Sequence, residues 1–262
     1  MSAIHAEALQ YMLVIPAYNE AATIHELLEQ VLAQKPKQLL LINDASNDDT
    51  GKIVDNFINS HSTQPVKVIH NTENLGKAAS LWLAFEQAIA QGMDVVITMD
   101  GDGQHPAEDI PALLKSHLEQ PEHIIIGARE RNLKNQPIGR FLANRFANFW
   151  ISWAAGYSVS DSQSGFRLYP VSLLKKIPCL KNSPGFVFES EVIIEAAWQG
   201  YYTSIVNIPS IYHKNRRPSH FQAWQDIKKI TKMVAARLVI TRFNLKDLWA
   251  VLSKKPAPIN NE

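Results

Sequence analysis

Short apolar runs alternate with segments of helical periodicity along the first half of the chain. The runs are rich in Val, Ile and Leu and lie at residues 11–16, 39–42, 66–69, 95–99 and 124–126. Between them apolar residues recur at helical spacing, as over 20–33 and 77–90. This alternation predicts right-handed βαβ units, and hence an α/β fold with a mainly parallel central sheet flanked by helices. Sheets of this kind bind ligands beyond the carboxyl ends of their strands.

The second half of the sequence is less regular. Aromatic and small residues at 141–155 predict a helix, and residues 161–169 predict a loop that enters a strand. A further helix is expected over 188–198, followed by a last strand over 204–208. Glu189, Glu191 and Glu195 lie on that helix, where a solvated face is a commoner role for glutamate than catalysis.

Charge and cysteine content restrict the compartment but predict no partner. The 262 residues include 26 Lys and Arg and 25 Asp and Glu, which gives a net charge of +1. A single cysteine, Cys179, excludes an internal disulfide and fits a reducing compartment. No basic segment followed by an apolar core starts the chain, and no apolar stretch approaches the roughly 18 to 20 residues that cross a bilayer. We therefore expect a cytoplasmic protein, with any membrane contact peripheral and on the inner face.

The most informative local pattern is VVITMDGDGQHP, an apolar run that ends in two aspartates. Asp100 and Asp102 point to the same side of an extended chain, so both carboxylates can reach one point. A hard divalent cation such as Mg²⁺ or Mn²⁺ suits that point, and Gln104 could add an amide oxygen. Gly101 lets a bulky ligand approach the backbone. A surface turn is the alternative, because Asp-Gly is common in turns.

Two other nucleotide-binding patterns fail. Around Gly76 and Lys77 the sequence lacks the upstream glycine of a P-loop, and Ala78 stands where Ser or Thr is required. The fingerprint G-x-G-x-x-G follows none of the predicted strands. These absences disfavour a kinase, an ATPase or a dehydrogenase.

Five segments together resemble the family 2 glycosyltransferases of GT-A fold. Within that family they are most similar to the branch of dolichol-phosphate mannose synthase-like, polyprenyl-phosphate glycosyltransferases. The resemblance covers about residues 11–221. Its carriers are Val14–Glu20, Asn43–Asp48, Asn74–Lys77, Asp100–Pro106 and Asp161–Arg167.

The resemblance implies a site for a nucleotide-sugar donor. Pro16, Tyr18 and Glu20 would line the nucleoside pocket, and Ile42 and Asp44 would contact the base or the ribose. The sequence departs from the common family pattern beside Asp44, because asparagine precedes it where many members have a second aspartate, and alanine follows it where glycine is usual. These departures leave the choice of base open.

The same resemblance assigns the diphosphate and the cation. Asp100, Gly101, Asp102 and Gln104 would bind both, with Asp100, Asp102 and Gln104 as the metal ligands. Further contacts to the donor would come from Lys77, Arg129, Arg216 and Arg217. Near the last two, the family's Gly-x-Ser-Lys element is replaced by Arg-Pro-Ser-His, so the phosphate contact at this end is less certain to carry over.

For mechanism, the resemblance implies inversion at the anomeric carbon by a single in-line attack. A lipid-phosphate acceptor is already an anion and needs positioning more than deprotonation, whereas a hydroxyl acceptor requires a general base. Asp161 is the first candidate for the acceptor-side carboxylate and Glu191 the second, with Arg167 as a further catalytic candidate.

Structural roles remain open for several of these residues. Glu20 could simply begin a helix, where it would complement the helix dipole. Asp44 could form only a turn or a cap. Lys77 could be a solvated surface lysine, and Arg167 could belong to a structural ion pair.

A basic segment follows residue 213. Between residues 214 and 246 there are nine Lys or Arg and one acid, Asp226. Apolar residues recur there at helical spacing, namely Ile227, Ile230, Met233, Val234, Leu238 and Val239. A basic amphipathic helix of this kind suits an anionic membrane surface. The alternative is a helix packed on its own domain, and nucleic acid is a poor third because no recognition motif accompanies the charge.

The sequence therefore predicts a catalytic domain over 1–213, a basic amphipathic helical segment over 214–253, and a disordered tail over 254–262. The predicted function is transfer of a sugar from a UDP- or GDP-sugar to a polyprenyl-phosphate or related lipid, with a divalent cation. The first alternative is transfer to a hydroxyl of a glycan or glycolipid. A non-catalytic nucleotide-sugar-binding protein is the second.

Overall fold

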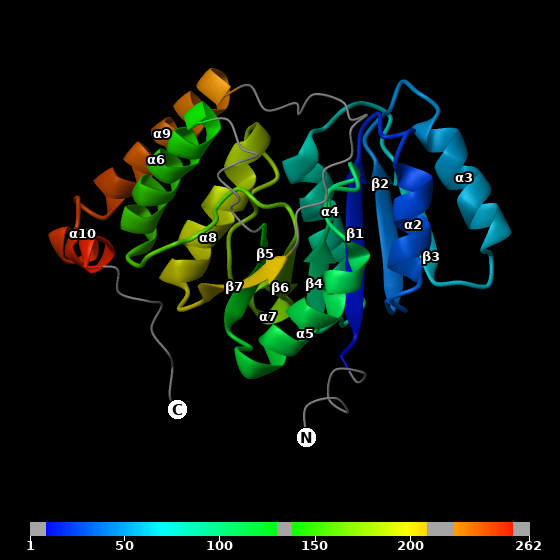
Figure 1. Ribbon diagram of the computed structural model, residues 1–262, viewed down its shortest axis with the longest axis horizontal. Coiled ribbons are helices and arrows are strands. Elements are labelled where there is room, and N and C mark those ends of the chain that lie inside the picture. The colour runs from blue at the N-terminus through cyan, green and yellow to red at the C-terminus, as the bar shows by residue number, and fades with distance from the viewer. Residues whose placement is uncertain (1–8, 130–137, 209–222, 254–262) are drawn as a thin grey trace.

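A seven-stranded sheet runs through the molecule in the order β3-β2-β1-β4-β6-β5-β7 (Figure 1). It comes from a computed structural model, which describes residues 9–129, 138–208 and 223–253. The strands are β1 (Tyr11–Ala17), β2 (Gln38–Asn43), β3 (Val66–His70), β4 (Val95–Thr98), β5 (His123–Arg129), β6 (Arg167–Pro170) and β7 (Tyr202–Ile208). All neighbouring pairs are parallel except the two that contain β6. The predicted mainly parallel sheet is confirmed.

Helices cover both faces of this sheet, because successive strand residues point to opposite faces. Met12 and Val14 of β1 enter a core shared with α4, α7 and α8, whereas Leu13 and Ile15 enter a core shared with α2, α3 and α5. The helices are α2 (Ile24–Leu32), α3 (Thr50–Ser60), α4 (Lys77–Ala90), α5 (Ile110–Glu119), α6 (Ile138–Ala155), α7 (Val171–Leu174), α8 (Phe188–Trp198), α9 (Ala223–Ile240) and α10 (Leu245–Leu252). Short 3₁₀ turns, η1 (Ala107–Asp109) and η2 (Gly185–Val187), precede α5 and α8.

The order of the strands contains a switch point between β1 and β4. The chain builds outward from β1 through β2 to β3, and then returns to place β4 on the other side of β1. Open α/β sheets bind ligands outside the carboxyl ends of the strands at such a point. The loops that carry Tyr18 and Asp100 leave the sheet there.

The reversed strand β6 brings a third loop to the same edge of the sheet. Thr98, the last residue of β4, pairs with Arg167, the first residue of β6. The loop before Arg167 therefore lies where the loop after β4 begins. The sequence predicts this loop and a strand after it, but not the direction of the strand.

The C-terminal helix α9 packs against the rest of the protein. Together with α6 it forms a layer at one end of the molecule, with α8 between them and the sheet (Figure 1). Ile230, Val234 and Leu238 of α9 are at most 3% exposed and belong to the main core. The prediction that this apolar face meets a membrane is therefore wrong for these three side chains, because the domain already covers them.

An ion-pair cluster also fixes α9. Arg237 donates to Glu191 of α8 at 2.7 Å and lies 2.6 Å from Glu195 on the same helix. Glu189 and Glu195 are 2% and 5% exposed, and the side chain of Glu191 is 15% exposed. The expected solvated face on this helix is thus wrong, because its acids are paired with cations of other elements.

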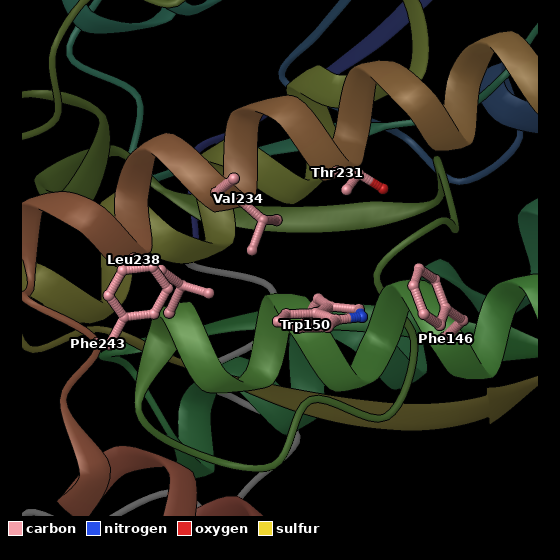
Figure 2. Close-up of a pocket in the computed structure, with 7 residues that line it drawn as sticks. Phe146, Trp150, Thr231, Val234, Leu238 and Phe243 are labelled. Carbon is pink, nitrogen blue, oxygen red and sulfur yellow. The ribbon is translucent and has the colours of Figure 1, made fainter.

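An apolar pocket of about 230 Å³ lies between α6 and α9 (Figure 2). Its lining consists of Phe146, Trp150, Thr231, Val234, Ala235, Leu238 and Phe243. Beside it, the end of α9 and the following helix α10 expose a group of large apolar side chains that we call the C-terminal apolar surface. Its members are Val239, Ile240, Phe243, Leu245, Trp249 and Leu252. Among the described residues, no helix is both long and apolar enough to span a membrane.

Candidate active site

The loops that follow β1 and β2 are tied together by hydrogen bonds. The backbone N–H of Asn19 donates to Oγ of Ser46 at 2.9 Å, and Oδ1 of Asn19 accepts from the N–H of Asn47 at 2.7 Å. The N–H of Glu20 donates to Oγ1 of Thr50 at 2.8 Å. The resemblance assigns Pro16, Tyr18 and Glu20 to the nucleoside pocket. Tyr18 and Glu20 are partly exposed on this double loop, and Pro16 is partly exposed near the end of β1.

Asp44 organises the loop that leads into α4. Its carboxylate accepts hydrogen bonds from Nδ2 of Asn71 at 2.7 Å, from the N–H of Leu75 at 2.9 Å and from the N–H of Gly76 at 2.8 Å. Gly76 has φ +86°, a conformation that side chains disfavour. The structure therefore gives Asp44 a role in loop architecture, and its contact with a base or ribose stays a prediction.

The two neighbours of Asp44, where the sequence departs from the family pattern, both shape the loop. Ala45 has φ 56°, the left-handed region in which glycine is unstrained. The amide of Asn43 contacts Nδ1 of His70 at 3.0 Å, and its Oδ1 accepts from the N–H of Ser46 at 3.1 Å. Asn43 is thus committed to holding the loop together. Ile42 has no exposed surface and supports the loop from the core, and its contact with a base or ribose stays a prediction.

The loop after β4 carries Asp100, Gly101 and Asp102 at the switch point. Oγ1 of Thr23 donates to the carbonyl of Gly101 at 2.8 Å, which fastens this loop to the start of α2. A Cβ at Gly101 would lie 3.1 Å from the side chain of Glu20, so a side chain at this position would crowd the neighbouring loop. Oδ1 of Asp102 accepts from the N–H of Gln104 at 2.9 Å.

The loop that enters β6 presses against Asp100. A Cβ at Gly165 would lie 2.3 Å from Oδ2 of Asp100, so only glycine allows this approach. Oγ1 of Thr98 donates to the carbonyl of Gly165 at 2.8 Å. Oδ1 of Asp161 accepts from the N–H of Gln163 at 3.0 Å and shapes the start of the loop. The sequence motifs at 100–106 and 161–167 thus meet in space.

Lys77 completes the cluster. Its Nζ lies 2.7 Å from Oδ1 of Asp100 and 2.6 Å from Oε1 of Glu189. Burial, the largest effect on the pKa of Lys77, lowers it, but Asp100 and Glu189 outweigh burial and the pKa stands above its ordinary value. Lys77, whose side chain is 23% exposed, is therefore a partly buried, charged partner of Asp100, and the alternative of a solvated surface lysine is wrong.

Sequence reasoning missed Glu189 as a member of this cluster, and the acceptor-side role of Glu191 stays a prediction. Glu189 touches Lys77, whereas Glu191 accepts from Oγ of Ser183 and from Arg237. Residues two apart on a helix face different directions, so only one of the two acids can reach Lys77. The sequence did contain a signal for Glu189. It directly follows Phe188, a large apolar residue that enters the core in the first turn of the helix.

Arg167 is fully buried and bonds to the main chain. Its three guanidinium nitrogens donate to the carbonyls of Ser164 at 2.7 Å, Glu189 at 2.8 Å and Ser162 at 2.9 Å. These bonds join the loop before β6 to the first turn of α8. Arg167 therefore holds Gly165 and Glu189 in their places around Asp100 and Lys77, and its catalytic role remains a prediction.

Some predicted contacts fall outside the described part of the chain. Arg216 and Arg217 lie in 209–222, and the side chain of Arg129 is likewise not described. Across the described ranges, no group of three or more His, Cys, Asp or Glu side chains is arranged as a metal site. Asp100, Asp102 and Gln104 stay the predicted cation ligands, and two carboxylates at one point would fit a cation that completes its coordination with phosphate oxygens of a substrate.

Comparison with known proteins shows which family has a similar sequence. The sequence profile of glycosyl transferase family 2 matches residues 12–177. A UDP-N-acetylglucosamine–dolichyl-phosphate N-acetylglucosaminyltransferase of Methanococcus voltae is 28% identical over 220 residues, which cover 79% of this chain and 87% of that protein. A polyprenol monophosphomannose synthase of Mycolicibacterium smegmatis is 27% identical over 203 residues, which cover 76% of this chain and 75% of that protein.

Solved structures agree on the fold. Glucosyl-3-phosphoglycerate synthase of Mycobacterium tuberculosis in complex with UDP superposes with a TM-score of 0.63 at 19% identity, over 88% of this chain and 82% of that chain. Another structure of that synthase contains Mn²⁺, UDP and phosphoglyceric acid. The central sheet and its covering helices match the GT-A architecture. Since the family profile also covers more than half of the sequence, this protein belongs to glycosyl transferase family 2 and is a glycosyltransferase of GT-A fold.

Proposed function

We propose that this glycosyltransferase moves a sugar from a nucleoside-diphosphate donor to a polyprenyl phosphate, with inversion and with the help of a divalent cation. One observation carries the proposal. The loops after β1, β2 and β4 converge with the loop before β6 around Asp100, at the switch point of the sheet. Donor and acceptor can therefore meet at one edge of the sheet.

The donor half of the proposal rests on the two aspartates. Asp100 and Asp102 would hold the cation, with Gln104 as a further oxygen ligand. A bound divalent cation acts as a Lewis acid that neutralises charge on a departing diphosphate. The ammonium of Lys77 adds positive charge beside Asp100, and this charge favours a leaving group that becomes more anionic in the transition state. Arg129, Arg216 and Arg217 remain proposed phosphate contacts.

The acceptor half rests on the relatives named above, two of which are named for dolichyl phosphate or for a polyprenol monophosphate product. A phosphate acceptor is a nucleophile without losing a proton, so the protein's task is to orient it. Asp161 lies on the loop that presses against Asp100 and is partly exposed. It is the proposed acceptor-side carboxylate, and Glu191 is less suited because Arg237 and Ser183 occupy it.

A lipid acceptor requires the enzyme to reach a membrane surface, and we propose that the C-terminal apolar surface makes this contact. Leu245 and Trp249 are 72% and 68% exposed, which is uncommon for side chains of this size. Arg242 and Lys246 stand among them in sequence. Basic residues near apolar anchors suit the anionic headgroups of an inner membrane face.

The deciding experiment measures release of nucleoside diphosphate from a panel of UDP- and GDP-sugars. Each donor is tested with Mg²⁺ or Mn²⁺, and with or without a polyprenyl phosphate. The proposal expects release that requires the lipid and that disappears with chelator or in Asp102→Ala. Asp49→Ala is the matched control, because Asp49 is an exposed carboxylate paired with Lys52 away from the cluster.

Other results would assign other functions. Metal-dependent release that ignores the lipid phosphate but responds to a glycan or glycolipid would indicate a hydroxyl acceptor, and full turnover by Asp161→Asn would remove Asp161 from the acceptor side. If no donor is cleaved while nucleotide sugars still bind, the protein is a nucleotide-sugar-binding protein and the proposal fails.

A further inference from the structure

The ammonium of Lys77 occupies one of the two carboxylates that the proposed function gives to a divalent cation. Nζ of Lys77 lies 2.7 Å from Asp100 and 2.6 Å from Glu189. The side chain of Glu189 is 3% exposed and that of Asp100 is 31% exposed. Lys77 thus bridges two carboxylates. Solvent and ligands can reach that of Asp100 but not that of Glu189.

The position of each partner follows from the backbone. Lys77 is the first residue of α4, directly after the N–H of Gly76 that donates to Asp44. Glu189 lies in the first turn of α8, and its own carbonyl accepts from Nη1 of Arg167. Lys77 and Glu189 both lie at the start of a helix. The lysine can therefore exchange Asp100 for Glu189 by moving its side chain, without movement of the backbone.

A cation that binds Asp100 must compete with this ammonium, because both are attracted to the same carboxylate. Expelling the ammonium without a second partner would leave a mostly enclosed positive charge, 23% exposed, without compensation, which is unfavourable. Glu189 supplies that second partner. The lysine can therefore leave Asp100 and stay paired.

We propose that Lys77 is an internal counter-ion of Asp100 in the cation-free enzyme, and that Glu189 is a positioning residue that retains the ammonium when a divalent cation takes Asp100. This inference rests on the proposed cation site at Asp100 and Asp102. It makes Glu189 a determinant of cation affinity that acts through Lys77, although Glu189 itself is not a cation ligand.

The inference predicts a specific pattern of Mn²⁺ affinities. Lys77→Met removes the competitor and binds Mn²⁺ about tenfold more tightly, since a neighbouring charge typically shifts ion binding by at least this factor. Glu189→Gln leaves the ammonium with Asp100 alone and binds Mn²⁺ several-fold more weakly. The double variant has no ammonium to place, so it binds as Lys77→Met does.

The measurement is a titration with Mn²⁺ alone, followed by water-proton relaxation enhancement, which reports binding into the millimolar range. Glu195→Gln is the matched control, because Glu195 is another buried acid of α8 paired with a cation, Arg237. Its Mn²⁺ affinity should equal that of the wild type. The double variant also guards against misfolding, since it buries no unpaired charge, and thermal unfolding of every variant checks that each is folded.

Two results would overturn the inference while leaving the cation site intact. One is a Lys77→Met variant that binds Mn²⁺ no more tightly than the wild type. The other is a loss on Glu189→Gln that is equally large in the Lys77→Met background, which would mean that Glu189 acts on the cation directly. If Asp102→Ala binds Mn²⁺ as well as the wild type, the proposed cation site is itself wrong, and the inference falls with it.

Discussion

The carboxylate of Asp44 accepts a hydrogen bond from the backbone N–H of Gly76 at 2.8 Å, and so fixes the residue directly before Lys77. Asp44 follows β2 and Gly76 precedes α4, so this bond joins two crossovers of the sheet. Through it, a residue that the sequence marks for nucleotide contact also places the lysine that pairs with Asp100.

The first prediction tests this bond. Asp44→Asn keeps one acceptor oxygen but removes the charge that three donors share. We expect a loss of about 1 to 3 kcal/mol in the free energy of unfolding, the cost of unpaired buried donors. Denaturant unfolding measures it, with Asp49→Asn as control, because Asp49 is exposed and pairs with Lys52. Equal stability of Asp44→Asn and wild type would contradict the role given to Asp44.

A second prediction concerns the contact between Gly165 and Asp100. Gly165→Ala places a methyl group 2.3 Å from Oδ2 of Asp100, unless the loop or the carboxylate moves. Overpacking of this kind costs about 1 to 3 kcal/mol, and displacement of Asp100 should weaken Mn²⁺ binding as well. Thermal unfolding and Mn²⁺ titration are measured on the same sample. A variant unchanged in both properties would show that the loop and Asp100 are farther apart than described.

A third prediction concerns the attachment of α9. Arg237→Met leaves Glu191 and Glu195 facing each other without their cation. Breaking such a pair typically costs about 3 kcal/mol. Burial already raises the pKa of Glu195, with Arg237 as the main opposing influence. The variant should raise that pKa further.

The sign of the pH effect follows from linkage. A carboxyl with a raised pKa in the folded state binds protons more strongly when folded, so stability falls as the pH rises above its unfolded pKa. Arg237→Met should therefore be more strongly destabilised at pH 7 than at pH 5. Denaturant midpoints at the two pH values measure the difference. A loss that is the same at both would mean that Arg237 acts only by packing on Trp198, whose ring it overlies.

The fourth prediction tests the proposed membrane contact. The paired change Leu245→Ser and Trp249→Ser removes two large apolar side chains from the C-terminal apolar surface. Burial of each in a membrane contributes on the order of 1.5 to 3 kcal/mol at most, so binding to vesicles with anionic lipid should fall at least about tenfold. Co-sedimentation with phosphatidylglycerol vesicles measures it. Ile205→Ser is the control, because Ile205 is 44% exposed on β7, outside this surface.

Sedimentation that is unaffected by the paired change would exclude this surface as the membrane contact. Phe243 belongs to this surface and also lines the pocket between α6 and α9 (Figure 2). Dimerisation in place of vesicle binding would instead indicate that a second copy of the chain covers the surface.

Much of the fold was predictable because the sheet strands are nearly continuous apolar runs. The helices at 77–90 and 188–198 begin and end where the sequence indicates. β7 begins at Tyr202, before the expected Ser204, because its first residues are only partly buried and carry a weaker apolar signal. The direction of β6 could not be read, since four buried residues look the same whichever way the strand runs.

The site was predictable only as far as its loops. The motifs identify Asp100 and the loop at 161–165. Partners that lie far apart in the sequence form no local pattern, so the sequence does not show which of them meet. Lys77 and Glu189 are 112 positions apart (189 minus 77) and meet because α4 and α8 cover the same face of the sheet. The apolar face of α9 was misassigned for a related reason, since a stripe that covers α6 and a stripe that covers lipid have the same periodicity.

The antiparallel course of β6 has a consequence for how such an enzyme can diversify. Two kinds of loop border the site: those that follow β1, β2 and β4, and one that arrives from α6. The first kind joins consecutive βαβ units, whereas the arriving loop is held at its far end by the pairing of Arg167 with Thr98. The arriving loop can therefore change in length or sequence while the crossovers after β1, β2 and β4 keep their connections.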